Sequence, residues 1–227
     1  MTQLLVNEIF WSIQGEGHFT GTPAVFVRLQ GCDVRCPWCD TGYALDVRAE
    51  NRLSDNSTQV LAKLGSDPRY TAADADWLVG QLLARKSPIR HLVLTGGEPF
   101  MQDIVPLLER LEREHFMVQV ETSGTRPLPA PALERTWITL SPKLAKLPLP
   151  ENWERANELK IPVLHPGDLT VLAPFLEKLE GLERLHRPLV SLQPVSQNRE
   201  ATKLCIELCM KNNWKLSLQT HKFIDLR

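Results

Sequence analysis

Short apolar runs, most of them rich in β-branched residues, recur along this chain of 227 residues. Between them lie segments in which apolar residues return every three or four positions. Runs of about four to eight apolar residues are typical of buried strands, and the longer repeat is typical of amphipathic helices. We predict strands at residues 24–29, 91–94, 117–120, 137–140, 158–163, 189–192 and 215–218, and helices at residues 75–84, 105–114, 169–179 and 202–211.

The order of these segments predicts an α/β fold. Strands that alternate with helices form parallel βαβ units, and eight such units in succession close into a barrel. About six or seven strands are too few for closure. We therefore expect a single domain over residues 1–227, built as an incomplete (β/α) barrel of about six parallel strands. A doubly wound open sheet is the alternative.

Residues 46–73 depart from this alternation. The stretch is polar, contains Gly65-Ser66-Asp67-Pro68, and offers one brief apolar turn at 60–64. We interpret it as a polar insertion between the segment that holds Cys32, Cys36 and Cys39 and the first predicted helix. We expect a solvated loop, and a partner-binding surface is the alternative.

The composition narrows the classes of partner. Lysine and arginine together number 26 and aspartate and glutamate 27, so the formal net charge is −1 at pH 7. This balance lacks the basic surface that grips nucleic acid, and we expect no direct nucleic-acid partner. No apolar run approaches the roughly 20 residues of a membrane-spanning helix, and the first residues lack the pattern of a secretion signal. We expect a cytoplasmic protein that does not bind a membrane.

Three of the five cysteines crowd into one short segment. Cys32, Cys36 and Cys39 follow a predicted strand with the spacing Cys-x3-Cys-x2-Cys. An odd number of cysteines in a reducing compartment favours metal or redox chemistry over disulfides. Three thiolates leave one position open on a four-coordinate centre. Either that position is kept open for chemistry, or His18 or His221 completes a Cys3His zinc site.

The other two cysteines follow a different pattern. Cys205 and Cys209 lie four positions apart, on one face of a predicted helix. Free cysteine is a common core residue, so we expect both side chains to pack in the interior.

Glycine and small or charged polar residues follow almost every predicted strand. In a (β/α) barrel the loops after the strands build the active site, so we expect these residues to line one face. They are Gln30-Gly31-Cys32, Thr95-Gly96-Gly97-Glu98-Pro99, Glu121-Thr122-Ser123-Gly124, Ser141-Pro142-Lys143, Gln193-Pro194-Val195-Ser196 and Gln219-Thr220-His221-Lys222.

The cysteine loop and the later Gly96-Gly97-Glu98-Pro99 segment resemble the two signatures of the radical S-adenosylmethionine superfamily. The resemblance implies that the three cysteines hold three irons of a 4Fe–4S cluster. It also implies that S-adenosylmethionine chelates the fourth iron and is cleaved reductively to a 5′-deoxyadenosyl radical. Contacts to this cofactor are implied for Gly97, Glu98, Ser123, Ser141, Pro142, Lys143 and Gln193.

The similarity narrows further over nearly the whole chain. The segments QGEG, CDT, TGGEP, ETSGT, SPK, LQPVSQ and LSLQTHK resemble the family of 7-carboxy-7-deazaguanine synthases, enzymes of queuosine biosynthesis. The resemblance implies a carbon–nitrogen lyase that takes 6-carboxy-5,6,7,8-tetrahydropterin, contracts its ring and releases ammonia. It further implies magnesium, a flavodoxin- or ferredoxin-like electron donor, and a homodimer.

The resemblance also implies a set of substrate contacts. Arg28 shares one face of its predicted strand with Phe26 and Gln30, and its guanidinium suits a substrate carboxylate. An edge or surface salt bridge is the alternative role for this arginine. The implied substrate-binding residues are Ile13, Gln14, Gly15, Glu16, Arg28 and Thr95.

Two polar positions carry alternatives. Thr41 is implied as the magnesium ligand, with Asp40 as the alternative. His221 either lines the substrate pocket with Gln219 or packs the last strand against its neighbour.

Two rival functions remain open at this point. A glycyl-radical activating enzyme shares the cysteine loop and acts on a protein, and it has no need of Arg28 or the QGEG segment. A zinc module that binds protein or nucleic acid would use the same cysteines without catalysis.

Overall fold

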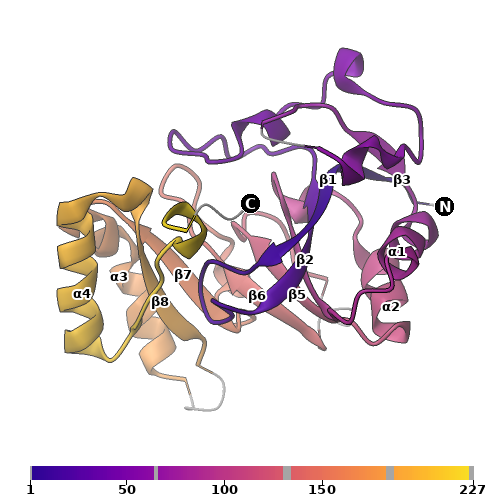
Figure 1. Cartoon of the computed structure of the whole chain (residues 1–227). Coiled ribbons are helices and arrows are strands. Elements are labelled where there is room, and N and C mark those ends of the chain that lie inside the picture. The colour runs from indigo at the N-terminus through magenta and orange to yellow at the C-terminus, as the bar shows by residue number, and fades with distance from the viewer. Residues whose placement is uncertain (1, 64–65, 130–133, 183–186, 225–227) are drawn as a thin grey trace. The chain divides into compact units, whose positions relative to one another are not determined.

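The computed structural model describes residues 2–63, 66–129, 134–182 and 187–224. The chain divides into two compact units (Figure 1). Unit 1 comprises Met1–Ser12, Pro23–Thr122 and Leu128–Trp137, and unit 2 comprises Ile13–Thr22, Ser123–Pro127 and Ile138–Arg227. The expectation of a single domain over residues 1–227 stays a prediction.

Unit 1 is built on an open run of strands in the order β3-β1-β2-β4-β5. The edge strand β3 pairs antiparallel with β1, whereas β2, β4 and β5 pair in parallel. The two helices pack against each other, and α2 also packs on β5 (Figure 1). The elements are β1 Leu4–Ile13, whose last residue belongs to unit 2, β2 Pro23–Leu29, β3 Thr71–Ala73, α1 Ala75–Ala84, β4 His91–Gly96, α2 Val105–Arg113 and β5 Met117–Thr122.

Local chemistry explains where the two helices of unit 1 begin. The Asp74 carboxylate accepts a hydrogen bond from the Trp77 backbone N–H at 2.8 Å, which satisfies an otherwise unpaired donor in the first turn of α1. Helix α2 has a proline in its first turn, and it buries Leu107, Leu108 and Leu111 along one stripe.

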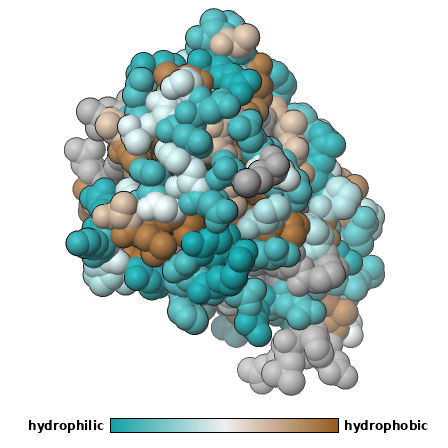
Figure 2. All heavy atoms as spheres, turned by 90° about the vertical axis from the view of Figure 1, so that its right-hand side faces the viewer, coloured by the Kyte–Doolittle hydropathy of each residue, from teal (hydrophilic) through white to brown (hydrophobic). Residues whose placement is uncertain are grey.

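The face of the molecule shown in Figure 2 is mostly hydrophilic, with hydrophobic residues in small patches, as is ordinary for a protein surface.

Unit 2 holds the strands β6-β7-β8-β9, which all pair in parallel. Helices α3 and α4 pack against β7 and β8 (Figure 1). The core contains Trp153 stacked on Phe175 at 4.5 Å, and both Cys205 and Cys209, as predicted. The elements are β6 Thr136–Leu140, whose first two residues belong to unit 1, β7 Glu158–Val163, α3 Pro166–Glu180, β8 Leu189–Pro194, α4 Arg199–Asn212 and β9 Lys215–Leu216.

The predicted strands and helices all occur, although β9 is shorter than expected. Strand β1 was not predicted, because Asn7 and Glu8 interrupt its apolar pattern. Both side chains are buried and paired inside unit 1, so the strand contradicts the usual alternation of apolar and polar residues. Among the described residues, no helix is both long and apolar enough to cross a membrane.

The expectation of a solvated loop at residues 46–73 is only partly right. Its last residues form β3, and Tyr70 is buried. The buried Lys63 ammonium donates to the Asn7 side-chain oxygen at 2.7 Å and to the carbonyl oxygens of Asn7, Asp67 and Arg69 at 3.0, 2.6 and 2.7 Å. These bonds tie the segment to β1. Residues 64–65 lie outside the described residues, and a partner-binding role stays a prediction.

Candidate functional site

The cysteine loop leaves the end of β2 and returns to it. The Gly31 N–H donates to the Ala44 carbonyl at 2.8 Å, and the Cys32 N–H donates to the Leu45 carbonyl at 3.0 Å. Within the loop, the Cys39 N–H donates to the Cys36 carbonyl at 3.2 Å. These backbone bonds close the base of the loop, so its three cysteines are carried on one short segment.

Cys32, Cys36 and Cys39 form no disulfide, and all three are of intermediate exposure. Burial raises the pKa of the Cys32 thiol above its ordinary value. In the part of the chain that the structure describes, no group of three or more His, Cys, Asp or Glu side chains is arranged to hold a metal ion. The loop carries three thiols, and their role as cluster ligands stays a prediction.

The Gly96-Gly97-Glu98 motif lies directly against the start of the cysteine loop. The Gly97 N–H donates to the Leu29 carbonyl at 3.1 Å, and the Glu98 N–H donates to the Gly31 carbonyl at 2.9 Å. A Cβ atom on Gly97 would lie 1.9 Å from the Gly31 carbonyl oxygen. Only glycine permits this approach, so the structure brings the two predicted motifs side by side.

The Gly97 contact makes a clear prediction about stability. The change Gly97→Ala should lower the free energy of unfolding by about 2–3 kcal/mol, because the new methyl group overlaps backbone atoms that have little room to move. Gly80→Ala in α1 is a matched control, since its Cβ would have no neighbour within 4 Å. That variant should gain about 0.5–1 kcal/mol from helix propensity. Denaturant unfolding under anaerobic conditions measures both, and equal stability of Gly97→Ala and wild type would contradict the contact.

The side chain of Glu98 is buried beneath this motif. Its Oε1 atom accepts hydrogen bonds from the Thr122 hydroxyl at 2.7 Å and from the Phe100 N–H at 3.2 Å. A carboxylate held by two donors is fixed in orientation and retains acceptor capacity for an ammonium group.

Arg28 lies in a buried cluster in unit 1. Its Nε donates to Glu8 Oε1 at 2.7 Å, and the Tyr43 hydroxyl donates to the same oxygen at 3.0 Å. The side chains of Arg28 and Glu8 are only 14% and 4% exposed, so the salt bridge expected as the alternative role is present but buried, and the substrate role stays a prediction. A guanidinium has five N–H donors, so Glu8 and Tyr43 leave several for a ligand. The register of β2 and β4 sets Arg28 beside Thr95, which joins two predicted substrate residues.

Thr41 lies between the two motifs of unit 1. Its hydroxyl is 3.4 Å from the Gly96 carbonyl oxygen and 3.6 Å from the Cys39 sulfur. Asp40 is exposed at the neighbouring position. These positions agree with a metal ligand at either residue and do not choose between them.

In unit 2, residues 14–22 form a turn that carries the QGEG segment. The Gln14 N–H donates to the Thr22 carbonyl and the Gly21 N–H donates to the Gln14 carbonyl, both at 2.8 Å. The Gln14 side-chain oxygen accepts from the Glu16 N–H at 3.1 Å. The turn fixes the position of the Glu16 side chain, while Ile13 precedes it as the exposed last residue of β1.

Glu16 makes a close ion pair. Its Oε2 accepts from the Lys160 ammonium at 2.5 Å, and its Oε1 accepts from the Gln219 amide at 2.8 Å. Burial raises the pKa of the Glu16 carboxyl, but the charge of Lys160, the two hydrogen bonds and the charge of His221 outweigh it and lower the pKa to about 2. Glu16 is therefore an anion throughout the neutral range.

The imidazole of His221 packs on the QGEG segment. A Cβ atom on Gly15 would lie 2.4 Å from His221 Nδ1, and the Thr220 N–H donates to the Gly15 carbonyl at 3.0 Å. The His221 ring therefore lies against this loop, and the two roles predicted for it stay predictions.

The later strand ends of unit 2 carry further predicted cofactor residues. Ser141 accepts a hydrogen bond from the Lys143 ammonium at 2.5 Å. The Gln193 side-chain oxygen accepts from the Ser217 hydroxyl at 2.9 Å, and that hydroxyl accepts from the Gly17 N–H at 2.8 Å. Pro142 is buried, and the buried Ser123 hydroxyl lies 3.0 Å from that of Thr125. The other two predicted cofactor residues, Gly97 and Glu98, belong to unit 1.

Three polar residues in these networks were missed by sequence reasoning. Glu8 holds Arg28, Lys160 holds Glu16, and Glu158 binds the backbone of the QGEG turn. Their shared signal is a charged side chain within a strand, since charges are rarely buried unless they are paired.

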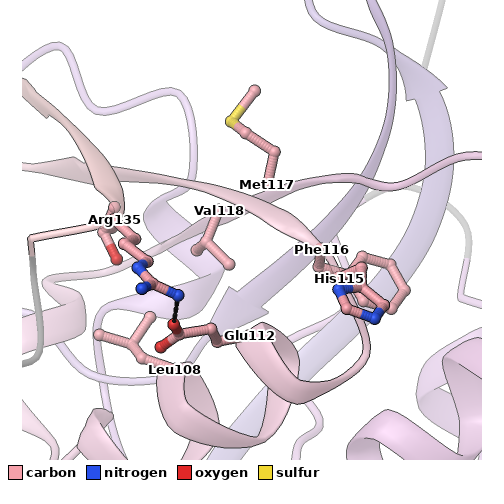
Figure 3. Close-up of a pocket in the computed structure, with 8 residues that line it drawn as sticks. Leu108, Glu112, His115, Phe116, Met117, Val118 and Arg135 are labelled. Atoms are coloured by element: carbon pink, nitrogen blue, oxygen red, sulfur yellow. Dashed lines mark hydrogen bonds and ion pairs between the residues drawn. The ribbon is translucent and has the colours of Figure 1, made fainter.

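A small pocket lies at the other end of β5, near Met117 (Figure 3). An ion pair between Glu112 and Arg135 crosses it. Because β5 begins at Met117 and the predicted site residues follow its carboxyl end at Thr122, this pocket is separate from the candidate site. Its lining is Leu108, Glu112, His115, Phe116, Met117, Val118, Arg135 and Thr136.

Comparisons with known proteins agree with these motifs. Residues 26–142 match the Radical SAM superfamily. The chain is 40% identical over 222 residues to a 7-carboxy-7-deazaguanine synthase of Buchnera aphidicola, with 98% of each chain covered. It is 41% identical over 229 residues to a protein of that name from Escherichia coli, with 99% of each covered. A crystal structure of QueE from Escherichia coli matches with a TM-score of 0.86 and 40% identity, over 95% of this chain and 93% of that one.

The superfamily match spans more than half of the chain, so this protein belongs to the radical S-adenosylmethionine superfamily. Within that superfamily, its identity over nearly the full length of both relatives makes it a member of the 7-carboxy-7-deazaguanine synthase family. It is a radical S-adenosylmethionine lyase that acts on a small molecule, with the incomplete (β/α) barrel fold.

The superfamily uses a 4Fe–4S cluster and S-adenosylmethionine, and the residue types in the two motifs suit both. Thiols are the usual ligands of such a cluster and this loop carries three of them, while the buried Glu98 carboxylate suits an amino group. The predicted family, fold class, enzyme class and these two cofactors are thereby confirmed. The individual residue roles stay predictions.

Proposed function

We propose that this chain converts 6-carboxy-5,6,7,8-tetrahydropterin to 7-carboxy-7-deazaguanine with loss of ammonia, a step of queuosine biosynthesis. The name of the full-length relatives supports this reaction. The observation that carries it is the Arg28–Glu8 pair, because it places a fixed, buried cation beside Thr95 and near the start of the cysteine loop. A carboxylated substrate needs such a group.

In this proposal the cysteine loop, Glu98 and Arg28 bind the cofactors and the substrate carboxylate. Cys32, Cys36 and Cys39 hold the cluster, and Glu98 receives the amino group of S-adenosylmethionine, with further contacts from the predicted residues. When bound, these cofactors supply the reductive cleavage that starts hydrogen abstraction from the substrate. Arg28 binds the substrate carboxylate through donors that Glu8 and Tyr43 do not use.

The QGEG segment of unit 2 recognises the heterocycle. Glu16, held as an anion, accepts hydrogen bonds from N–H groups of the pterin, and Gln14 fixes the turn that carries it. Gly15 is a predicted substrate contact, and its missing Cβ lets His221 pack against the turn.

Magnesium and the partners complete the proposal. Thr41 binds Mg²⁺ together with substrate oxygens and water, which suits a cation that keeps few protein ligands. A flavodoxin- or ferredoxin-like protein donates the electron, and the chain acts as a homodimer in the cytoplasm. Light scattering of the reconstituted protein tests the homodimer.

The proposed function is tested by anaerobic turnover of the reduced, reconstituted protein. With carboxytetrahydropterin and S-adenosylmethionine we expect 7-carboxy-7-deazaguanine and ammonia, faster with Mg²⁺ than after chelation. Thr41→Val is expected to lose most of the stimulation by Mg²⁺, because the methyl group that replaces the hydroxyl cannot ligate the cation. An intact cluster without the deazaguanine product would overturn the reaction, and a Thr41→Val variant that still responds to Mg²⁺ would shift the metal to Asp40.

A further inference from the structure

Strand β7 supports the QGEG turn at two charged points. Glu158 and Lys160 are alternate residues of β7, so their side chains share one face of the strand. Glu158 is fully buried and accepts hydrogen bonds from the His18 N–H at 3.1 Å and from the Ser191 hydroxyl at 2.6 Å. Lys160 donates to Glu16 at 2.5 Å. Strand β7 therefore holds the turn through Glu158, which accepts from its backbone, and through Lys160, which pairs with the Glu16 side chain.

Lys160 is the cation in direct contact with Glu16. The two side chains are 6% and 18% exposed, so water screens their attraction weakly. From the C-terminal segment, Gln219 donates to the other oxygen of Glu16, and His221 adds positive charge. Lys222, the residue after His221, donates to the Gln219 side-chain oxygen at 2.8 Å.

The Lys160–Glu16 ion pair determines whether the Glu16 carboxyl can donate a hydrogen bond to a ligand or only accept one. A buried carboxyl without a cation takes up a proton and then carries a donor, whereas an ionised carboxylate only accepts. A carboxylate has about four acceptor positions, and Lys160 and Gln219 occupy one on each oxygen. Acceptor positions therefore remain on both oxygens. Two adjacent N–H donors on one edge of a ring fit that arrangement.

We propose that Lys160 is a positioning residue that keeps Glu16 an ionised double acceptor, which selects the aminopyrimidinone edge of the pterin. This inference rests on the proposed function, since that function brings a pterin to the QGEG turn. Its substrate class is a ring that presents an amino group next to a ring N–H. A ring with an acceptor at either position would meet an anion and be rejected.

The test compares pH profiles of kcat/KM for carboxytetrahydropterin. Wild type should show no acidic limb from Glu16 above pH 5. In Lys160→Met, the loss of the cation lets Glu16 protonate, so kcat/KM should fall about tenfold per pH unit below a new apparent pKa and recover at higher pH. Lys160→Arg keeps the charge and should restore the wild-type profile.

Lys63→Met is the matched control. Lys63 is also a buried lysine, but its ammonium donates to the carbonyl oxygens and the amide oxygen named above and not to Glu16. Its loss should destabilise the protein and produce no acidic limb. An acidic limb of equal size in Lys63→Met would overturn the proposal, because any buried lysine would then do the same.

A double variant guards against poor folding of Lys160→Met. Glu16→Gln should lower kcat/KM at every pH, and Lys160→Met/Glu16→Gln should be no worse than Glu16→Gln, because Lys160 acts through Glu16. A double variant more than threefold worse would overturn the proposal, as would an unchanged pH profile in Lys160→Met while wild type turns over. Wild-type protein with an intact cluster and no turnover would overturn the proposed function itself.

Discussion

Replacement of Cys36 by alanine is expected to abolish cleavage of S-adenosylmethionine. The three cysteines of the loop are the thiol donors at one short segment, so loss of one leaves the cluster with two protein ligands. The backbone bonds that close the loop at Gly31 and Cys32 do not involve the side chain of Cys36, so the protein itself should still fold.

Two measurements check this result. Iron and sulfide content, together with the visible absorption of the thiolate–iron cluster, should fall to background in Cys36→Ala, and methionine release should fall at least 1000-fold. Cys205→Ala is the matched control, because this cysteine lies on the buried face of α4, in the core of unit 2. It should cost about 1 kcal/mol of stability and keep the cluster. Full iron content in Cys36→Ala would remove Cys36 from the ligand set.

Arg28→Ala is expected to lower kcat/KM for the pterin by about 100- to 1000-fold and to spare the cluster. In Arg28→Ala the substrate carboxylate loses its cation. Removal of one partner of a desolvated ion pair costs about 3–4 kcal/mol, which corresponds to this loss of kcat/KM. Methionine release in the absence of the pterin should stay within twofold of wild type, because the Arg28 side chain lies on β2, binds Glu8 and packs on the rings of Phe10 and Tyr43.

The same change leaves Glu8 buried without its cation, which should cost about 3 kcal/mol of stability. Arg28→Ala/Glu8→Gln relieves that charge and should recover part of the stability while kcat/KM stays low. Arg85→Ala is the control arginine, since its guanidinium lies 4.0 Å from the Trp11 ring. Steady-state kinetics decide the matter, and an Arg28→Ala enzyme with wild-type kcat/KM would take Arg28 out of the site.

The fold was predicted from short-range periodicity in the sequence. The prediction was wrong for a strand whose polar side chains have partners far along the chain. Helix α1 was predicted at its observed bounds, because its apolar stripe and its Asp74 cap are local features. Strand β1 was missed, because the partners that satisfy Asn7 and Glu8 come from segments far along the chain, such as Lys63 and Arg28. The pattern within ten residues contains no trace of those partners.

The same division holds for the site. Cys32, Cys36 and Cys39 and the Gly96-Gly97-Glu98 motif lie in short segments of fixed spacing, so the sequence shows them directly. Lys160 is 144 residues from its partner Glu16, and a lysine in an apolar strand has no motif. Only the register of β7 with its neighbours and the path of the turn bring the two charges together.

The bonds between the QGEG turn and the C-terminal segment have a consequence for synthesis of the protein. The Gly17 N–H donates to the Ser217 hydroxyl across 200 residues, and Gln219 and Thr220 bind the same turn. A nascent chain folds from its N-terminal part while the rest is still being made. The turn therefore reaches its final shape only after residues 217–220 leave the ribosome. An unfinished chain folds its cysteine loop early and still lacks a complete QGEG turn.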